Sequence, residues 1–409
     1  MRIRSVQAHL LSYLLPEPLK VTYLGGERTI VKRDTMLIRV EADNGLIGYG
    51  PAPGTEPAKS AIDRVIAPFL TGRTLADPDA LRVHFVEETG RDPGLQKLYC
   101  AVEIALYDLV GKEQSRPISE LLGGRVRDRI RLYASAGLQA TPEEHAEEAH
   151  AISQLGFRAY KLQSGMGPDQ DLDAVRRTRE AVGPDFDLIV DAHAWWQAAD
   201  RNYLQATMDR LAGQLGEYNI AWLEEPLPPN DHDGYRRLRE LDLVSLASGI
   251  HEPDEPHFLD LILAGVDYLQ LDLVSQGGYA TACRMVREVS RAGLKFAFHS
   301  WGTALEVIAA AHLGVCWPDQ LVEWLEYPCY STRSRKGVYP FPLAEELLRE
   351  PLQLDHGDLI LPKRPGLGVE VDEAVVERYP WIPGPEVLVR TDSKLPASMS
   401  SRGAHRQAS

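Results

Sequence analysis

Short apolar runs in the middle of the chain end repeatedly in a residue that can carry charge or exchange a proton. Side chains two positions apart on a strand share a face, so a strand would place Lys161 beside Gln163 and Asp191 beside His193. One acidic residue at such a place is usually the cap of the next helix. Recurrence along most of the runs is harder to explain as capping and predicts a shared site. The runs end at Lys161 and Gln163, Asp191 and His193, Glu224, Asp272, His299 and Glu323.

These residue types suit proton transfer assisted by a cation. Carboxylates from adjacent strands, Asp191 and Glu224, suit a hard cation that prefers oxygen ligands, such as Mg²⁺. Asp272 and His299 end adjacent strands, where the carboxylate would orient the imidazole and stabilise its protonated form. Lys161 and His299, on opposite sides of such a site, could exchange a proton with a substrate carbon.

An alternation of short apolar runs with amphipathic stretches must position these residues. Counted from Ile130–Ala134 to Glu323, it gives eight strands, each followed by helical character, and predicts an α/β fold. We expect a modified (β/α)8 TIM-type barrel over residues 126–345, whose active site lies at the C-terminal ends of the strands. A doubly wound open sheet would normally offer a Gly-rich first turn, which this sequence lacks.

The sequence on either side of the barrel predicts a second unit. Residues 1–125 read as strands followed by helices, which predicts an α+β capping domain. The Asp-Asn-Gly stretch at 43–45 lies between two apolar runs and is a strong hairpin signal. We expect residues 346–390 to return to the cap, and the polar stretch 391–409 to be a disordered tail.

Composition excludes several classes of function. The chain has 409 residues, 44% hydrophobic and 25% charged, as in an ordinary globular protein. Acidic residues outnumber basic ones by 59 to 44, and the net charge of −15 argues against a nucleic-acid partner. Four cysteines without CxxC spacing favour a reduced, cytoplasmic compartment. No long apolar run occurs and Pro16 and Pro18 interrupt the leucine-rich start, so we expect neither a membrane span nor a signal peptide.

Three further motifs make the pattern specific. They are Ala105-Leu-Tyr-Asp-Leu-Val-Gly-Lys112, Leu121-Leu-Gly-Gly124 and Pro365-Gly-Leu-Gly-Val369. Together with the residues at the strand ends, they resemble the mandelate racemase and muconate-lactonising branch of the enolase superfamily over nearly all of residues 1–380. The resemblance implies a cap over a modified barrel, with a small carboxylate substrate held between them, in a homo-oligomer. It also implies Mg²⁺-assisted abstraction of the proton α to that carboxylate.

The resemblance also implies roles for individual residues. Asp191 and Glu224 correspond to the first two metal ligands of the family. Asp272 with His299 corresponds to its catalytic dyad, and Lys161 to the first lysine of its Lys-x-Lys pair.

Substrate contacts are expected from both units. Glu323 matches the carboxylate that bonds the substrate carboxyl or enediolate oxygen in the family. In the cap, specificity comes from loops near the first hairpin, where Tyr23 and Arg28 are candidate ligand contacts. Gln163 can hydrogen-bond a hydroxyl or carboxylate of the substrate.

Two departures from the family pattern affect the chemistry. Ile250 stands where the third metal-binding Glu is expected, and an isoleucine cannot ligate a cation. Glu252 is the substitute candidate ligand, two residues further on, so the Mg²⁺ site is expected to be weakened or incomplete. Gln163 occupies the position of the second lysine in the family's Lys-x-Lys pair, and a glutamine cannot take a proton at neutral pH.

The departures favour dehydration of an acid sugar, an aldonate or aldarate, to a 2-keto-3-deoxy acid. Dehydration needs one base, for which His299 with Asp272 is the candidate, and one acid, for which His193 is the candidate. One alternative is a racemase or epimerase in which Lys161 is the second base. The other is a degenerate member that binds a sugar acid without turning it over.

Overall fold

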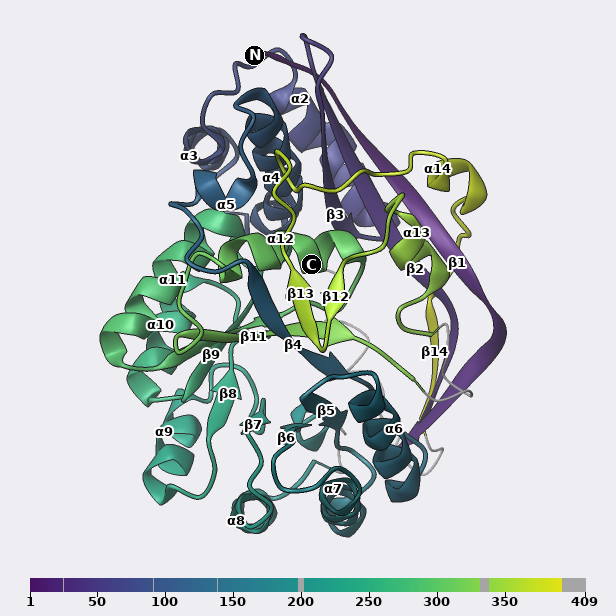
Figure 1. The fold of residues 1–409 in the computed structure, drawn as a ribbon, viewed down its shortest axis with the longest axis vertical. Helices are drawn as coiled ribbons and strands as arrows, with labels where there is room; N and C mark the ends of the chain where they lie inside the picture. The colour runs from purple at the N-terminus through teal and green to yellow at the C-terminus, as the bar shows by residue number, and fades with distance from the viewer. Residues whose placement is uncertain (25, 91, 138, 198–201, 332–337, 392–409) are drawn as a thin grey trace.

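The structure is a computed structural model that describes residues 1–391, apart from residues 25, 91, 138, 198–201 and 332–337. It consists of an antiparallel sheet with helices, packed over a closed barrel (Figure 1). The tail expected over 391–409 lies outside the described residues, except Thr391, which ends the last strand.

The antiparallel sheet of the cap is built on one long hairpin. β1 (Ile3–Tyr23) pairs with β2 (Gly26–Ala42), which also pairs with β3 (Ile47–Pro53). Gly45 turns the chain between β2 and β3 with a φ of 85°, a conformation that glycine adopts without strain. The hairpin signal at 43–45 is therefore confirmed.

Helices cover this sheet and pack closely on it. Gly48 lies against the longest of them, because a Cβ there would come within 2.1 Å of the Ala105 carbonyl oxygen. That helix begins where the Asp92 side chain accepts a hydrogen bond from Leu95 N at 2.8 Å. The helical segments are α1 (Glu56–Ala61), η1 (Ile62–Ile66), α2 (Ala67–Leu70), α3 (Pro78–Thr89), α4 (Pro93–Glu113) and α5 (Ile118–Leu121).

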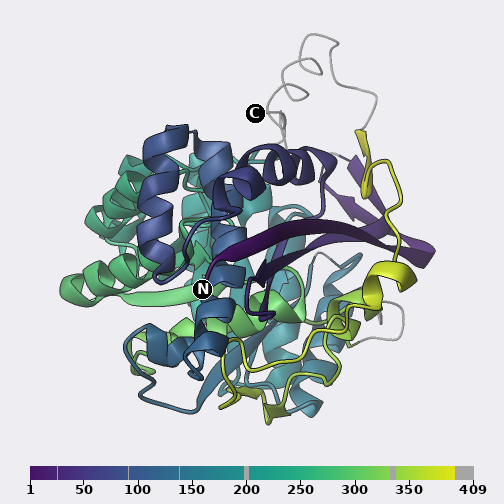
Figure 2. The same cartoon turned by 90° about the horizontal axis from the view of Figure 1, so that it is seen from above.

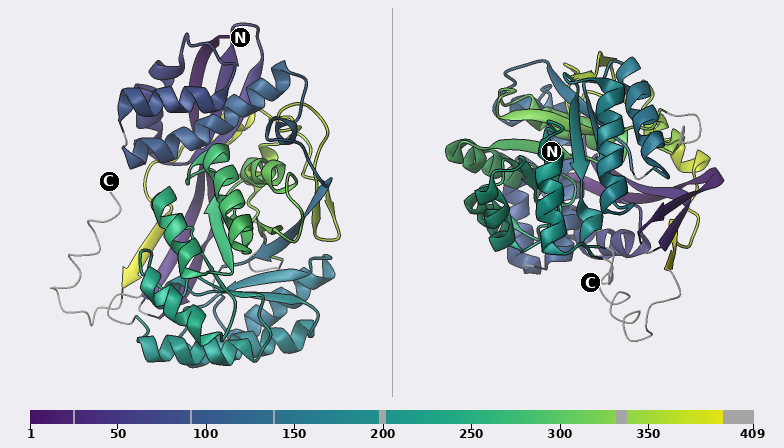
Figure 3. Two further views of the ribbon diagram at one scale, coloured as in Figure 1. Left: turned by 90° about the vertical axis from the view of Figure 1, so that its left-hand side faces the viewer. Right: turned by 90° about the horizontal axis from the view of Figure 1, so that it is seen from below.

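Eight parallel strands form the barrel, and the last of them pairs with the first. This closure confirms the predicted fold class, a modified TIM-type barrel with an N-terminal cap. Figure 3 shows the cap helices above the barrel on its left-hand view. The strands are β4 (Arg129–Ser135), β5 (Ala159–Gln163), β6 (Asp187–Asp191), β7 (Trp222–Glu224), β8 (Leu246–Ser248), β9 (Tyr268–Asp272), β10 (Lys295–His299) and β11 (Val322–Pro328).

The barrel strands alternate with helices and turns. None of the helices in the described part of the chain is long and apolar enough to cross a bilayer. The connecting elements are α6 (Pro142–Gln154), α7 (Pro168–Val182), the 3₁₀ turn η2 (His193–Trp195), α8 (Gln205–Gly216), α9 (His232–Leu241), α10 (Glu255–Ala264), α11 (Gly278–Ala292) and α12 (Ala304–Gly314).

One side chain from each barrel strand packs into a buried apolar cluster, the barrel floor. Four large aromatic side chains, three alanines and an isoleucine fill the interior together. Strand side chains repeat every two residues, so the residues two positions further along each strand also face inward. The floor consists of Tyr133, Ala159, Ile189, Trp222, Ala247, Tyr268, Ala297 and Trp324.

The segment after the barrel contacts both units. Its strand β13 (Asp358–Ile360) pairs with β4 of the barrel, and β14 (Val387–Thr391) pairs with β2 of the cap beside the hairpin end. Figure 2 shows β14 running alongside the long hairpin. The other elements of this segment are α13 (Pro342–Glu346), β12 (Leu354–Asp355) and α14 (Val375–Arg378).

Asp108, on α4, joins three parts of the molecule. Its Oδ2 accepts hydrogen bonds from Tyr49 N on β3 at 2.9 Å and from Lys112 Nζ at 2.6 Å. Its Oδ1 accepts from Leu367 N in the segment after the barrel at 2.8 Å. The side chain is 1% exposed, so water cannot replace these bonds.

Replacing Asp108 by Ala should lower the free energy of unfolding by about 2–4 kcal/mol, because it leaves two buried N–H groups and an ammonium without their acceptor. The midpoint of urea unfolding measures the change. Asp128→Ala is the control, since the Asp128 side chain is 64% exposed and its ion pair with Arg129 is long, at 3.6 Å. Equal losses in the two variants would contradict the role of Asp108.

Candidate active site

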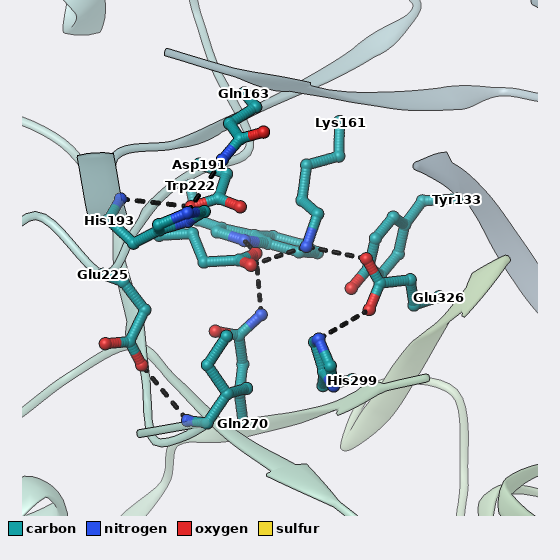
Figure 4. A network of polar contacts seen from close by, with 12 residues as sticks. Tyr133, Lys161, Gln163, Asp191, His193, Trp222, Glu225, Gln270, His299 and Glu326 are labelled. Carbon is teal, nitrogen blue, oxygen red and sulfur yellow. Dashed lines mark hydrogen bonds and ion pairs between the residues drawn. The ribbon is translucent and has the colours of Figure 1, made fainter. Parts of the chain in front are cut away.

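Above the barrel floor lies a ring of mostly polar residues, the polar layer. Each of them comes two positions after a floor residue, so the same strand geometry that packs the floor points them to the barrel axis. Figure 4 labels Lys161, Asp191, Gln270, His299 and Glu326 of this layer together with the floor residues Tyr133 and Trp222. The polar layer consists of Ser135, Lys161, Asp191, Glu224, Gly249, Gln270, His299 and Glu326.

Lys161 bridges two carboxylates across the polar layer. Its Nζ lies 2.6 Å from Glu224 Oε1 and 2.8 Å from Glu326 Oε1, and its side chain is 4% exposed. Burial would lower the pKa of Lys161, but Glu224 and Glu326 raise it well above its usual value. β7 and β11 are four strands apart in an eight-stranded barrel, so the ammonium lies near the axis (Figure 4).

The other oxygen of Glu224 is also engaged. Oε2 accepts hydrogen bonds from Gln270 Nε2 at 2.8 Å and from Trp222 Nε1 at 3.1 Å. Glu224 is fully buried, and these donors fix both of its oxygens inside the barrel.

Asp191 is paired with His193. Strand β6 ends at Asp191, and the 3₁₀ turn η2 brings the imidazole back, so that Nδ1 lies 2.6 Å from Asp191 Oδ1. The other ring nitrogen, Nε2, lies 2.7 Å from Gln163 Nε2. Burial would lower the pKa of His193, but the charge of Asp191 raises it. His193 was expected to share a strand face with Asp191, but it lies in the turn after the strand, and this turn brings the two side chains together.

His299 lies across the barrel from His193. Its Nδ1 is 2.8 Å from Asp272 Oδ2, and its Nε2 is 3.7 Å from Glu326 Oε2. Burial alone would lower the pKa of His299, but Glu326 and Asp272 raise it to about 9. Asp272 is held in place because its Oδ1 also accepts from Ser275 N at 2.9 Å.

A cavity of about 310 Å³ opens above the polar layer, between the barrel and the cap. That volume suits a small organic acid. Lys161, Asp191, His193, His299 and Glu326 line it on the barrel side. The cap and the last segment complete the wall with Arg28, Arg33 and Val387.

The structure brings most of the residues expected in the site together. The two cap candidates lie at its edge: Arg28 lines the cavity, whereas Tyr23 lines a smaller adjoining hollow of about 40 Å³. The Arg28 guanidinium lies 5.0 Å from the centre of the Tyr23 ring. The residues that line this cavity or contact those that do are Lys161, Gln163, Asp191, His193, Glu224, Asp272 and His299.

The expectation that Glu323 faces the substrate is wrong. Glu323 is the second residue of β11, at the opposite end of the barrel, where it lies 3.0 Å from Lys295 Nζ and 3.4 Å from Arg131 Nη1. The strand continues to Pro328, because the apolar run does not stop at the first glutamate. Glu326, further along the same strand, lines the cavity instead. The period of two along a strand predicts that it faces inward, because it follows the floor residue Trp324 by two positions.

Glu252, expected as a substitute for the third metal ligand, does not line the cavity either. It accepts a hydrogen bond from His232 Nε2 at 3.1 Å, outside the cavity. Ile250 lines the cavity where the family would place its third carboxylate. The neighbouring carboxylate, Glu225, accepts hydrogen bonds from the Gly249 and Ile250 N–H groups at 2.8 and 3.1 Å and so caps this loop.

These residues do not fit the Mg²⁺ ion that the resemblance implies. Mg²⁺ requires near-ideal octahedral oxygen ligation, usually through carboxylates and water. Asp191 and Glu224 are already bound to His193 and Lys161. Among the residues that the structure describes, no three His, Cys, Asp or Glu side chains are grouped so that they could hold a metal ion.

Comparisons with known proteins agree with this architecture. Residues 15–123 match the mandelate racemase / muconate lactonizing enzyme N-terminal domain, and residues 144–375 match the family described as enolase C-terminal domain-like. The chain is 29% identical to D-galactarolactone cycloisomerase from Agrobacterium fabrum, over 93% of this chain and 99% of the relative. It is 30% identical to L-rhamnonate dehydratase from Saccharopolyspora erythraea, over 85% of each.

A solved structure gives the same result. A member of the enolase superfamily from Polaromonas sp. JS666 superposes with a TM-score of 0.80 at 30% identity, covering 94% of this chain and 99% of that one. Both domains of the chain are thus accounted for by one family. The protein belongs to the mandelate racemase and muconate-lactonising branch of the enolase superfamily.

Proposed function

We propose that the protein is a dehydratase of an acid sugar, an aldonate or aldarate, which it converts to a 2-keto-3-deoxy acid. The observation that supports this most directly is the pair of histidines, His299 and His193, on opposite sides of one cavity and each tied to its own carboxylate. Two of the similar proteins, a cycloisomerase of a sugar lactone and a dehydratase of a sugar acid, have names consistent with such substrates.

The first step is removal of the α-proton by His299. Asp272 holds Nδ1, which leaves Nε2 directed to the cavity side, where Glu326 lies 3.7 Å away. In its neutral form His299 takes the proton at Nε2, and the electron pair of the C–H bond moves onto the substrate carboxylate. Lys161 binds that carboxylate and stabilises the enediolate through its ammonium group.

The second step is expulsion of the β-hydroxyl. His193 donates a proton to the leaving oxygen as the C–O bond breaks, and the electron pair of the enediolate forms the C=C bond. Water leaves, and the resulting enol tautomerises to the 2-keto acid. A positioned acid of this kind contributes about 10²–10⁴-fold to the rate.

Two alternatives follow from particular observations. Cycloisomerisation of a sugar-acid lactone uses the same base and acid with a ring oxygen as the leaving group, and the match to a lactone cycloisomerase favours it. Epimerisation would require Lys161 as the second base, and the two carboxylates that hold its ammonium oppose this role. A degenerate binding member would show neither proton exchange nor product.

The two histidines should separate the two steps. With a panel of sugar acids in D₂O, His299→Asn should abolish exchange of the α-proton while leaving binding intact. His193→Asn should retain that exchange and lose 2-keto product by about 10²-fold or more, because only the acid is missing. NMR of the substrate and a colorimetric keto-acid assay give the two readouts. Product formation at the wild-type rate in His193→Asn would make this residue structural.

The rate of α-proton exchange, which does not need the acid His193, should rise with pH up to about 9, because His299 must lose its proton to act as the base. Asp272 and Glu326 favour its protonated form, Lys161 opposes it, and Glu306 lies near enough to interact. Glu326→Gln should therefore move the pH profile of α-proton exchange to lower pH by about 1–2 units.

Glu323→Gln is the matched control, since the same change on the same strand lies at the far end of the barrel. It should leave the profile unchanged. NMR titration of the His299 ring measures the same shift without turnover. A profile that falls above neutral pH would instead assign His299 the role of acid.

A further inference from the structure

We propose that the Lys161 ammonium takes the place of the divalent cation in this site, so that the protein transfers the α-proton without a bound metal ion. The inference builds on the proposed function but has its own readout, the affinity for metal. The departure from the family on which it rests is Ile250 in place of the third metal-binding Glu, since Lys161 itself matches a lysine of the family pattern.

Lys161 holds Glu224, one of the two expected metal ligands, and Glu326, which the resemblance does not assign to the metal. Glu224 and Glu326 contribute one oxygen each, at 2.6 and 2.8 Å, from opposite sides of the barrel. Both carboxylates are fully buried, so they need a positive partner to remain charged. The ammonium supplies that charge from within the chain, on the inward face of β5 above the aromatic ring of Tyr133.

The residue that would complete a metal site is missing at the same place. Ile250 presents an apolar side chain to the cavity, and Glu225 and Glu252 are turned to other partners. A site with one carboxylate fewer needs one positive charge fewer. Loss of the third ligand and use of a single ammonium are thus consistent with each other.

A divalent ion would also have to break contacts that already exist. It would compete with Lys161 for Glu224 and with His193 for Asp191, and both contacts are 2.6 Å long. It would then share Glu224 with a buried ammonium, which repels it at low dielectric. Mg²⁺ is a poor competitor there, because it gives up its water shell reluctantly.

The ammonium retains the capacity to act on substrate. An ammonium has three N–H donors, of which Glu224 and Glu326 take two. Lys161 lines the cavity, so the remaining donor can reach a substrate carboxylate oxygen. This donor would stabilise the charge that develops on that oxygen as His299 removes the α-proton.

The unmodified protein provides the first test. Elemental analysis of the purified protein should show substoichiometric metal, and Mn²⁺ titration followed by electron paramagnetic resonance should show no tight site. The α-proton exchange rate should be the same with EDTA as with millimolar Mg²⁺. Stoichiometric metal, or exchange that requires Mg²⁺, would overturn the inference while supporting the proposed function. If no sugar acid exchanges under any condition, the proposed function fails, and the metal measurements alone decide the inference.

A variant tests the assignment to Lys161. Lys161→Met removes the ammonium and leaves Asp191, Glu224 and Glu326 without it, so Mn²⁺ affinity should rise about tenfold or more over wild type. Lys295→Met is the control, because Lys295 also pairs with a glutamate of β11, at 3.0 Å, but at the other end of the barrel. Lys161→Met without a gain in Mn²⁺ affinity, or with a gain no larger than that of the control, would overturn the inference.

A second variant serves if Lys161→Met does not fold. Lys161→Arg keeps the charge and should bind no more Mn²⁺ than wild type. Tight Mn²⁺ binding by Lys161→Arg would contradict the proposal.

Discussion

The alternation of side chains along the barrel strands is the constraint on which the site depends. Closure of the sheet fixes the register of neighbouring strands, so residues that face inward form levels perpendicular to the axis. One level packs aromatic and small side chains into the barrel floor, and the next level is the polar layer. Because the floor is well packed, the polar side chains above it are excluded from bulk water, which strengthens the pairing of Lys161 with its two carboxylates.

The sequence predicted the architecture and most residues of the site because both follow from local periodicity. Apolar runs ending in polar residues marked the strand ends at Asp191, Glu224, Asp272 and His299 correctly. Glu323 was chosen in error for Glu326, because both occur in one run and only the register against neighbouring strands distinguishes them. Once Trp324 is known to face inward, the period of two along the strand identifies Glu326 as the inward-facing glutamate.

Other features of the site depend on contacts between distant residues, and no local pattern carries them. Glu252 lies close to Ile250 in sequence, yet the loop turns it to His232. Gln270 reads as an ordinary strand residue, and its role appears only when Glu224 is found beside it. The placement of Lys161 between strands on opposite sides of the barrel likewise requires the closed barrel.

The long hairpin and β14 have a consequence for how this protein can diversify. They build the outer wall of the cavity from the first two strands and the last strand of the described chain, and Arg28 of β2 and Val387 of β14 line the cavity. These strands pair with each other rather than with the barrel, whereas each residue of the polar layer is fixed by neighbours on both sides. The wall can therefore accept substitutions that the polar layer cannot. Natural selection could change which acid enters the cavity by altering the long hairpin and β14, while the residues of the polar layer are inherited unchanged.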